Sequence, residues 1–312
     1  MPLGYDGKLY ILAFDHRGSF QKKMFGIEGD PTPEQTETIA DAKHLIYEGM
    51  LKAVEKSDVH PDQMGVLVDE QFGAPKNIPA DAKAAGLKLA MPVEKSGQDM
   101  FDFEYGSDFG EHILKFDPDF SKVLVRYNPE HDKAENEEQL GKLKQLADWL
   151  HANDRKFLFE LLVPAEPAQL EAVGGDSDRF DAEVRPELMR RAIEEIQDYG
   201  IEVDIWKIEG VDRREDAETL ARQTRTGEGR EGVVCVLLGR GASDEKVDHW
   251  LREAAPVEGF VGFAIGRSIW WDPLKGFLAG DLTREAAQEK IADKYLRFIK
   301  VYEEAESRAS VA

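Results

Sequence analysis

Short apolar runs alternate with longer amphipathic segments along the whole chain, and this alternation is the strongest constraint on its fold. Each run is rich in β-branched or other apolar residues and is bounded by turn residues, which is typical of a buried strand. The eight runs cover residues 8–14, 65–69, 87–91, 122–127, 156–163, 203–209, 233–238 and 260–265. The segments between them are long enough for helices, and several begin with Pro, Asn, Asp or Ser.

Eight strands that alternate with helices over 312 residues predict a (β/α)8 (TIM) barrel. A doubly wound sheet is the alternative, but no Gly-rich dinucleotide turn follows the first strand. No Pro- or Ser-rich linker divides the chain. We therefore expect one barrel domain over residues 1–312 with a polar tail at about 303–312, and a loop over the barrel mouth within residues 91–120.

The charge of the chain argues against two classes of partner. The sequence has 62 acidic and 40 basic side chains and a net charge of −22, which repels nucleic acid and anionic lipid. No apolar run is long enough to span a membrane, and the N-terminus lacks signal-peptide features, so we expect a cytoplasmic protein. The single cysteine, Cys235, permits no internal disulfide and no cysteine-built metal site. Assembly into a homo-oligomer is compatible with the sequence.

Lys207 is the first candidate catalytic residue. Chemistry in a barrel takes place at the carboxyl ends of the strands, where the period of two decides which side chains point inward. Lys207 and Glu209 share one face of the sixth strand, and the opposite face carries Trp206 and Ile208, which suit packing under a helix. A buried lysine loses its proton more easily and can attack a carbonyl to form a Schiff base. The alternative role is a structural ion pair with Glu209 or Glu160.

Glu160 is the second candidate. It is the one carboxyl in an apolar fifth strand, and burial of a lone carboxyl raises its pKa toward neutrality, which suits proton transfer. The alternative role is again that of a partner for a buried base.

Polar residues also follow the first, second and fourth strands. The first strand leads into Asp15, His16 and Arg17, the second into Asp69, and the fourth ends at Arg126. Each of these segments could instead be a solvated loop or a helix cap.

Two glycine- and arginine-containing loops follow the seventh and eighth strands. Barrels often hold a phosphate there, because glycine lets backbone amides approach the anion and arginine adds positive charge. The candidate phosphate-binding residues are Gly239, Arg240, Gly241, Gly266 and Arg267.

Together these segments resemble the class I tagatose 1,6-bisphosphate aldolase superfamily. The resemblance is carried by Phe-Asp-His-Arg-Gly-Ser at 14–19, Leu-Val-Asp-Glu-Gln-Phe-Gly at 67–73, Phe-Leu-Phe-Glu-Leu-Leu at 157–162, Trp-Lys-Ile-Glu at 206–209 and Gly-Arg-Ser-Ile-Trp at 266–270. Within the superfamily, the chain is most similar to the aldolase-like domain that follows a sugar kinase in some inositol-catabolism proteins. That domain is associated with cleavage of 2-deoxy-5-keto-gluconate 6-phosphate, and we expect its stand-alone form here.

The resemblance implies a lyase that needs no cofactor, because an imine on Lys207 serves as the electron sink. It implies that Glu160 takes a proton from a substrate hydroxyl and later returns one. The expected substrate is a phosphorylated keto sugar or keto acid, with dihydroxyacetone phosphate as the ketone product. Tagatose-type enzymes have a second lysine on the fourth strand, where Arg126 is expected here. An arginine at that position would hold a carboxylate or phosphate bidentately. The residues expected to position the rest of the substrate are Asp15, His16, Arg17, Asp69 and Glu209.

Two other functions remain open from the residues alone. A metal-dependent lyase or isomerase could use oxygen and imidazole ligands chosen from Asp69, Glu70, Glu160, Glu209 and His16, although no ligand pair has a recognisable spacing. A barrel that binds a phosphosugar without turning it over would use the same anion loops, with Lys207 as a counter-ion.

Overall fold

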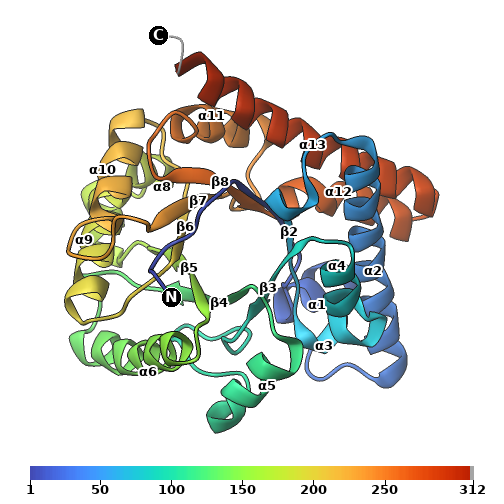
Figure 1. The fold of residues 1–312 in the computed structure, drawn as a ribbon, viewed down its shortest axis with the longest axis horizontal. Helices are drawn as coiled ribbons and strands as arrows, with labels where there is room; N and C mark the ends of the chain where they lie inside the picture. The colour runs from blue at the N-terminus through green and yellow to red at the C-terminus, as the bar shows by residue number, and fades with distance from the viewer. Residues whose placement is uncertain (310–312) are drawn as a thin grey trace.

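The protein folds into a closed barrel of parallel strands surrounded by helices (Figure 1). The structure is a computed structural model and describes residues 1–309. The strands follow one another around the barrel in chain order, and β1 pairs with β8 to close it. They are β1 (Leu9–Ala13), β2 (Met64–Leu67), β3 (Lys88–Pro92), β4 (Phe120–Arg126), β5 (Lys156–Leu162), β6 (Ile205–Glu209), β7 (Val234–Leu238) and β8 (Phe260–Ile265). This confirms the predicted (β/α)8 barrel, and every strand end lies within two residues of its predicted position.

Helices occupy the segments between the strands. In the described part of the chain the α-helices are α1 (Gly18–Phe25), α2 (Pro33–Lys56), α3 (Glu70–Gly73), α4 (Ile78–Ala84), α5 (Phe109–Phe116), α6 (Lys133–Ala152), α7 (Pro167–Ala172), α8 (Ser177–Arg179), α9 (Arg185–Asp198), α10 (Arg214–Thr224), α11 (Asp244–Ala254), α12 (Arg267–Leu278) and α13 (Arg284–Ala309). The other helical turns are the 3-10 turns η1 (Pro61–Gln63), η2 (Ala74–Lys76) and η3 (Gly106–Asp108) and the π-helical turn η4 (Phe180–Val184).

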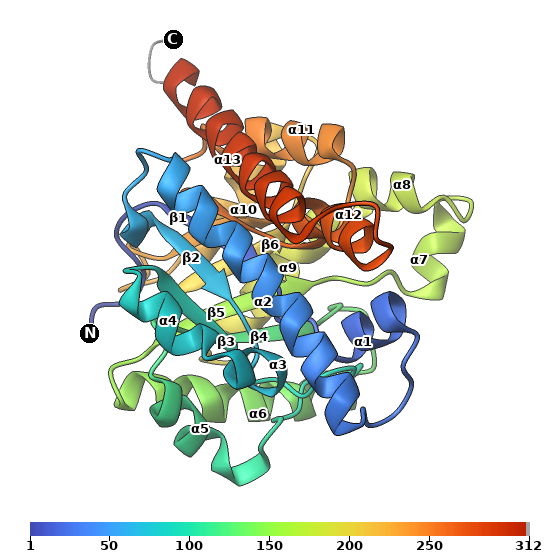
Figure 2. The same cartoon turned by 90° about the vertical axis from the view of Figure 1, so that its right-hand side faces the viewer.

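The two longest helices, α2 and α13, lie side by side and close the outer ring (Figure 2). α2 begins with a capping box, in which the Thr32 side chain accepts from the Gln35 backbone and the Gln35 side chain accepts from the Thr32 backbone. Gly49 allows the helices their close approach, because a Cβ there would lie 2.6 Å from Ile291 Cγ2.

Apolar side chains form two separate cores. The larger core lies between the outward faces of the strands and the helices. The smaller one fills the inside of the barrel with residues such as Leu9, Leu158, Ile205 and Val236. Because the inner core ends below the carboxyl ends of the strands, the polar side chains of the next layer lie on an apolar floor.

The last residues that the structure describes belong to α13. The predicted polar tail is helical from 303 to Ala309, and residues 310–312 lie outside the described part of the chain. No helix within residues 1–309 combines the length and the apolar composition needed to cross a membrane.

Candidate active site

A cavity of about 510 Å³ opens at the carboxyl ends of the strands. Its walls come mainly from six of the eight strand ends and from residues 94–101 of the loop after β3, so the predicted mouth loop lies where it was expected. The predicted site residues that line it are Asp15, His16, Arg17, Arg126, Glu160, Lys207, Glu209, Arg240, Gly241, Gly266 and Arg267. Asp69 and Gly239 are not part of the lining.

Lys207 and Glu160 form an ion pair at the floor of this cavity. The two residues are register partners on β6 and β5, so their side chains leave neighbouring strands at the same height and on the same inward face. Lys207 Nζ lies 3.0 Å from Glu160 Oε2, and Lys207 is only 3% exposed. The predicted inward orientation of Lys207 is confirmed.

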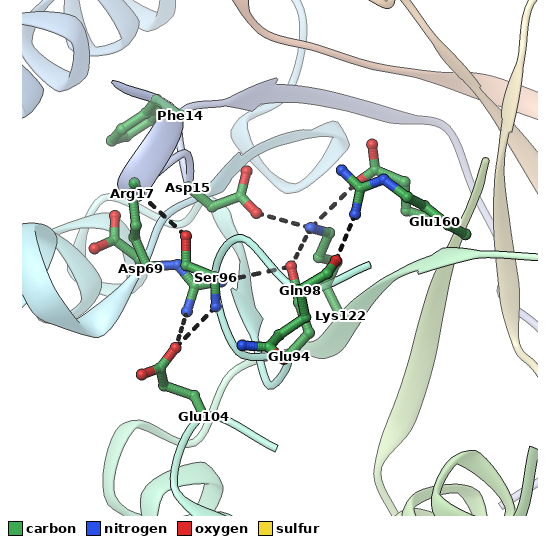
Figure 3. A network of polar contacts seen from close by, with 12 residues as sticks. Phe14, Asp15, Arg17, Asp69, Glu94, Ser96, Gln98, Glu104, Lys122 and Glu160 are labelled. Carbon is green, nitrogen blue, oxygen red and sulfur yellow. Dashed lines mark hydrogen bonds and ion pairs between the residues drawn. The ribbon is translucent and has the colours of Figure 1, made fainter. Parts of the chain in front are cut away.

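A second buried lysine, Lys122, joins the same cluster (Figure 3). It is the third residue of β4, and the period of two turns it inward together with Leu124 and Arg126. The Lys122 Nζ atom contacts three carboxylates: Asp15 Oδ2 at 2.9 Å, Glu94 Oε1 at 2.7 Å and Glu160 Oε2 at 3.1 Å.

Lys122 corrects the expectation that Arg126 replaces the second lysine of tagatose-type enzymes. The fourth strand carries both residues, four positions apart and on the same face. The predicted fourth strand begins at Lys122, and the sequence analysis assigns this residue no role. Counting back from Arg126 in steps of two would have turned Lys122 inward, but the partners that keep a buried lysine charged were not visible in the sequence.

The two lysines hold their carboxylate partners in the charged form. Burial by itself raises the pKa of Glu160, but Lys122 and Lys207 outweigh it and hold that pKa below its ordinary value. Burial also opposes the charge of Asp15, and Lys122 again lowers that pKa. The prediction of a raised pKa for Glu160 is therefore wrong, because it treated Glu160 as a lone carboxyl.

Lys122 itself stays protonated. Burial alone would lower its pKa, but the carboxylates of Asp15, Glu160 and Glu94 raise it above its ordinary value.

Glu94 is a site residue that the sequence reasoning missed. It follows β3 at the start of the mouth loop, and its side chain is 9% exposed. Burial raises its pKa and neighbouring Asp15 adds to the effect, although Lys122 and Arg17 oppose it. The position of this loop in the sequence predicts that it lies at the mouth, but gives no reason to select one of its several acidic residues.

His16 and Arg17 line the cavity beside this cluster. Burial lowers the pKa of His16 to about 3, with the positive charges of Arg267, Lys43 and Lys207 adding to the effect, so the imidazole is neutral. Arg17 Nη1 donates to Glu104 at 3.0 Å, and Arg17 Nη2 lies 3.6 Å from Glu94 Oε1.

Asp69 does not reach the cavity, which corrects its predicted role in substrate binding. It is fully buried, where one carboxylate oxygen pairs with Lys43 and the other accepts the Phe72 backbone N–H at 2.9 Å as the cap of α3. Lys43 also donates to the Phe14 carbonyl at 2.8 Å. The Lys43–Asp69 ion pair therefore holds the end of β1 in place from outside the cavity.

Glu209 and Arg240 form a separate charged group on the β6–β7 side. Glu209 Oε1 lies 3.1 Å from Arg240 Nε, and Glu209 Oε2 lies 3.5 Å from Arg185 Nε and accepts from the Val163 backbone at 3.0 Å. Arg240 also donates to Asp181 at 2.7 Å. Burial raises the pKa of Glu209, and the two arginines oppose that rise. Arg185 was not predicted as a site residue, because it lies in a helix.

Arg267, at the start of α12, is the arginine of the predicted phosphate loops that has the fewest polar contacts within residues 1–309. Arg267 is the first residue of α12, and its guanidinium donates to the Arg240 carbonyl at 3.3 Å, with no carboxylate within ion-pair distance among residues 1–309. Gly266 lets β8 approach β1, because a Cβ there would lie 2.3 Å from the Ala13 carbonyl oxygen. Gly241 lines the cavity directly beside Arg267, since a Cβ there would lie 3.3 Å from the Arg267 guanidinium.

Arg126 lies across the barrel from Arg267. Its Nη1 donates to the Gln98 carbonyl at 2.8 Å, which ties the mouth loop to β4. Like Arg267, it has no carboxylate partner within the described residues.

The residues considered for a metal site are dispersed. Asp69 pairs with Lys43, Glu70 with His112 and Lys115, and Glu160 with the two barrel lysines. Over residues 1–309, no three His, Cys, Asp or Glu side chains are grouped so that they could hold a metal ion. The acidic side chains at the barrel floor instead face ammonium groups.

Comparisons with known proteins agree with this fold. Cgl0159 from Corynebacterium glutamicum is similar over 95% of this chain and 88% of its own, with 18% identity and a TM-score of 0.56. A fructose-bisphosphate aldolase from Plasmodium falciparum is similar over 95% of this chain and 91% of its own, with 14% identity and a TM-score of 0.62. No curated protein sequence matches the chain. A family model described as "Uncharacterized protein conserved in bacteria (DUF2090)" matches residues 5–306, and the chain therefore belongs to the DUF2090 family.

Proposed function

We propose that this protein is a Schiff-base aldolase that cleaves a phosphorylated keto sugar or keto acid. The observation that carries the proposal is the buried pair of Lys207 and Glu160, 3.0 Å apart on the floor of an open cavity. An amine in contact with a carboxylate, next to space for a substrate, is what imine chemistry requires. The fold that the chain shares with a fructose-bisphosphate aldolase is consistent with this chemistry.

Lys207 is a better nucleophile than Lys122. Lys122 contacts three carboxylates, which raise its pKa and keep it an ammonium ion. Lys207 forms an ion pair with Glu160 alone among the described residues. A proton moved from Lys207 to Glu160 frees the amine, while Lys122 keeps its charge and stabilises the negative charge that develops on the substrate oxygen.

The reaction begins when the free amine of Lys207 attacks the ketone carbon. The resulting carbinolamine takes back the proton held by Glu160 and loses water, which leaves a protonated imine. Loss of a proton from the substrate hydroxyl then turns that C–O bond into an aldehyde carbonyl. The carbon–carbon bond breaks and its electron pair moves into the imine to give an enamine. Protonation of the enamine carbon and hydrolysis of the imine release the ketone.

Two arginines that have no carboxylate partner among the described residues support a substrate with an anion at each end. Arg267, with the amino end of α12, suits a phosphate, and Arg126 on β4 suits a carboxylate or a second phosphate. β4 and β8 are four strands apart in an eight-stranded ring, so the two arginines flank Lys207 from opposite sides. A deoxy-keto-gluconate phosphate, with dihydroxyacetone phosphate as one product, has this distribution of charge.

Trapping of the imine tests the proposal. The protein is incubated with dihydroxyacetone phosphate, reduced with borohydride and digested for mass spectrometry. We expect a reduced adduct on Lys207, and no adduct in the Lys207→Met variant. Lys144→Met changes a lysine on the outer surface of α6, where it pairs with Asp148, and is expected to behave as the wild-type protein.

Other outcomes favour the other functions. An adduct on Lys122 would overturn the assignment of the nucleophile. Sugar-phosphate turnover without an adduct, and lost on chelation, would favour a metal-dependent lyase or isomerase. Binding of dihydroxyacetone phosphate without an adduct or turnover would favour a non-catalytic phosphosugar-binding barrel.

A further inference from the structure

We infer that Glu94, rather than Glu160, is the base that removes the substrate hydroxyl proton and returns it to the enamine carbon. This inference rests on the proposed function and adds to it a third carboxylate with a distinct role. The observations that carry it are the position of Glu94 in the cavity wall, the bonding of its two oxygens and its contrast with Asp15 and Glu160.

The backbone around Glu94 is held rigidly at the mouth. Glu94 forms an antiparallel bridge with Phe103, and the bonds Lys95 N–H to Asp102 carbonyl (2.9 Å) and Glu104 N–H to Val93 carbonyl (3.0 Å) flank it. The side chain is more than nine-tenths buried and still forms part of the cavity lining. Glu94 is therefore a preorganised group that faces the space a substrate would occupy.

The two oxygens of the Glu94 carboxylate differ in their bonding (Figure 3). Oε1 accepts from Lys122 Nζ at 2.7 Å and lies 3.6 Å from Arg17 Nη2. Oε2 is buried and has no hydrogen-bond partner among the described residues. Since a buried acceptor without a donor is unfavourable, Oε2 is suited to accept a hydrogen bond from a substrate hydroxyl.

All three carboxylates of the cluster contact Lys122 through one oxygen, and they differ in their further neighbours and in the direction of their pKa shift. Glu160 Oε2 lies between Lys207 and Lys122, and Asp15 Oδ2 contacts Lys122. Both have a lowered pKa, which makes each a stable anion and a weak base. Glu94 faces Lys122 from β4 and both Arg17 and Asp15 from the segment after β1, and the net effect of burial and these charges is a raised pKa. A base works best when its pKa lies near the operating pH.

With Glu94 as the base, every proton and electron pair of the cleavage reaction is accounted for. The hydroxyl O–H bond breaks and its proton forms a bond to Glu94 Oε2, while the oxygen electron pair becomes the aldehyde carbonyl. The electrons of the broken carbon–carbon bond reduce the protonated imine on Lys207 to the enamine. Glu94 then returns the proton to the enamine carbon, and water hydrolyses the imine. No oxidant, reductant or further co-reactant is consumed.

Hydrogen exchange in a half-reaction tests this role. Dihydroxyacetone phosphate is incubated with the protein in D2O, and the deuterium that enters its carbon–hydrogen bonds is followed by NMR. In parallel, the borohydride adduct on Lys207 is quantified. We expect Glu94→Gln to form the adduct to within about twofold of wild type and to lower the exchange rate by about 100-fold or more. In wild type we expect the exchange rate to fall as the pH falls through the raised pKa of Glu94. In Glu94→Gln we expect this fall of the exchange rate at acidic pH to be absent.

Glu104→Gln is the matched control. Glu104 bonds the same Arg17 but is not part of the cavity lining, so this variant is expected to retain both adduct and exchange. A normal adduct and a normal exchange rate in Glu94→Gln would overturn the inference and leave the proposed function intact. Loss of the adduct in Glu94→Gln would also overturn it, since Glu94 would then act in binding. No adduct in the wild-type protein would overturn the proposed function, and the inference with it.

Discussion

At the scale of single residues, the site is organised around the charge of Lys122. Lys122 holds Asp15, Glu94 and Glu160 together, and the three carboxylates differ because each has different further neighbours. Glu160 has a second lysine, whereas Glu94 has a more distant arginine and the opposing charge of Asp15. Their pKa values therefore shift in opposite directions within one cluster.

Removal of the Lys122 charge is expected to destabilise the protein in a pH-dependent way. Lys122→Met leaves buried carboxylates without their ammonium partner, and we expect a loss of about 3–5 kcal/mol in the free energy of unfolding at neutral pH. The folded-state pKa values of Asp15 and Glu160 are lowered, so their stabilising contribution is present above the unfolded pKa values near 4 and is lost as the pH falls. The difference between wild type and variant therefore narrows on acidification.

Urea unfolding at a series of pH values measures this difference. Lys144→Met, which breaks an exposed pair with Asp148, is the control and is expected to change stability by no more than about 0.5 kcal/mol. An equal loss at every pH would show that the effect of Lys122→Met is one of packing and not of charge.

At the scale of elements, the strands supply the site residues and the helix ends fix where the strands stop. The register that pairs Glu160 with Lys207 follows directly from the pairing of β5 with β6. The first residue after β8 is Gly266, and α12 begins at the next residue, so Arg267 is brought to the cavity by the beginning of a helix. The side chain of Asp69 is used in the same way to begin α3, which withdraws it from the cavity.

The capping box at Thr32 is expected to stabilise α2, which packs against α13 in the outer ring. Thr32→Ala removes the hydroxyl that accepts from the Gln35 backbone, and we expect it to lower the free energy of unfolding by about 0.5–2 kcal/mol. Thr38→Ala, at an exposed position within the same helix, is expected to be neutral or slightly stabilising. Thermal and urea unfolding of the two variants compare them, and equal effects would contradict the role of the cap.

At the scale of the whole molecule, an acidic protein surrounds a basic cavity. The chain carries a net charge of −22, yet nine basic and only five acidic side chains line the cavity. The overall charge therefore says nothing about the sign of a ligand, because the field inside the cavity comes from the strand ends.

Arg267 is expected to account for much of the affinity of this cavity for a phosphate. Arg267→Gln keeps the backbone at the start of α12 but removes a charge that has no carboxylate partner within residues 1–309. We expect the Kd for inorganic phosphate to rise about 10-fold or more. Isothermal titration calorimetry at constant ionic strength measures this Kd. Arg222→Gln on the exposed side of α10 has the same change in net charge and is expected to leave the Kd unchanged. If both variants bind phosphate equally more weakly than wild type, the effect is a long-range one of net charge.

The closure of the helical ring depends on the contact between α2 and α13. Gly49→Ala would place a methyl group against Ile291, and we expect a loss of about 1–3 kcal/mol in the free energy of unfolding. Gly141→Ala, where the new methyl group meets only the Tyr199 hydroxyl at 3.7 Å, is expected to stabilise α6 by about 0.5–1 kcal/mol. Urea unfolding separates the two, and stabilisation by Gly49→Ala would show that the helices move apart easily.

The sequence by itself determined the barrel and the inward direction of Lys207, whereas the inward direction of Glu160 came from its register with Lys207. The alternation of apolar runs with helical segments, together with the strand period of two, carries that information locally. Arg126 and Arg267 could be found in the same way, as charged residues at strand ends. Within one strand, each prediction depends only on neighbours along the chain.

Only the tertiary structure decided which charges meet. Lys122 contacts carboxylates at three other strand ends. Asp69 pairs with Lys43 on α2 instead of facing the cavity. Glu94 lines the cavity because of the conformation of its loop. The charge state of a buried group depends on partners that are distant in sequence, since burial and opposite charges act on its pKa in opposite directions. For that reason the sequence pointed to Glu160 as a proton shuttle, whereas the three-dimensional arrangement supports Glu94 in that role.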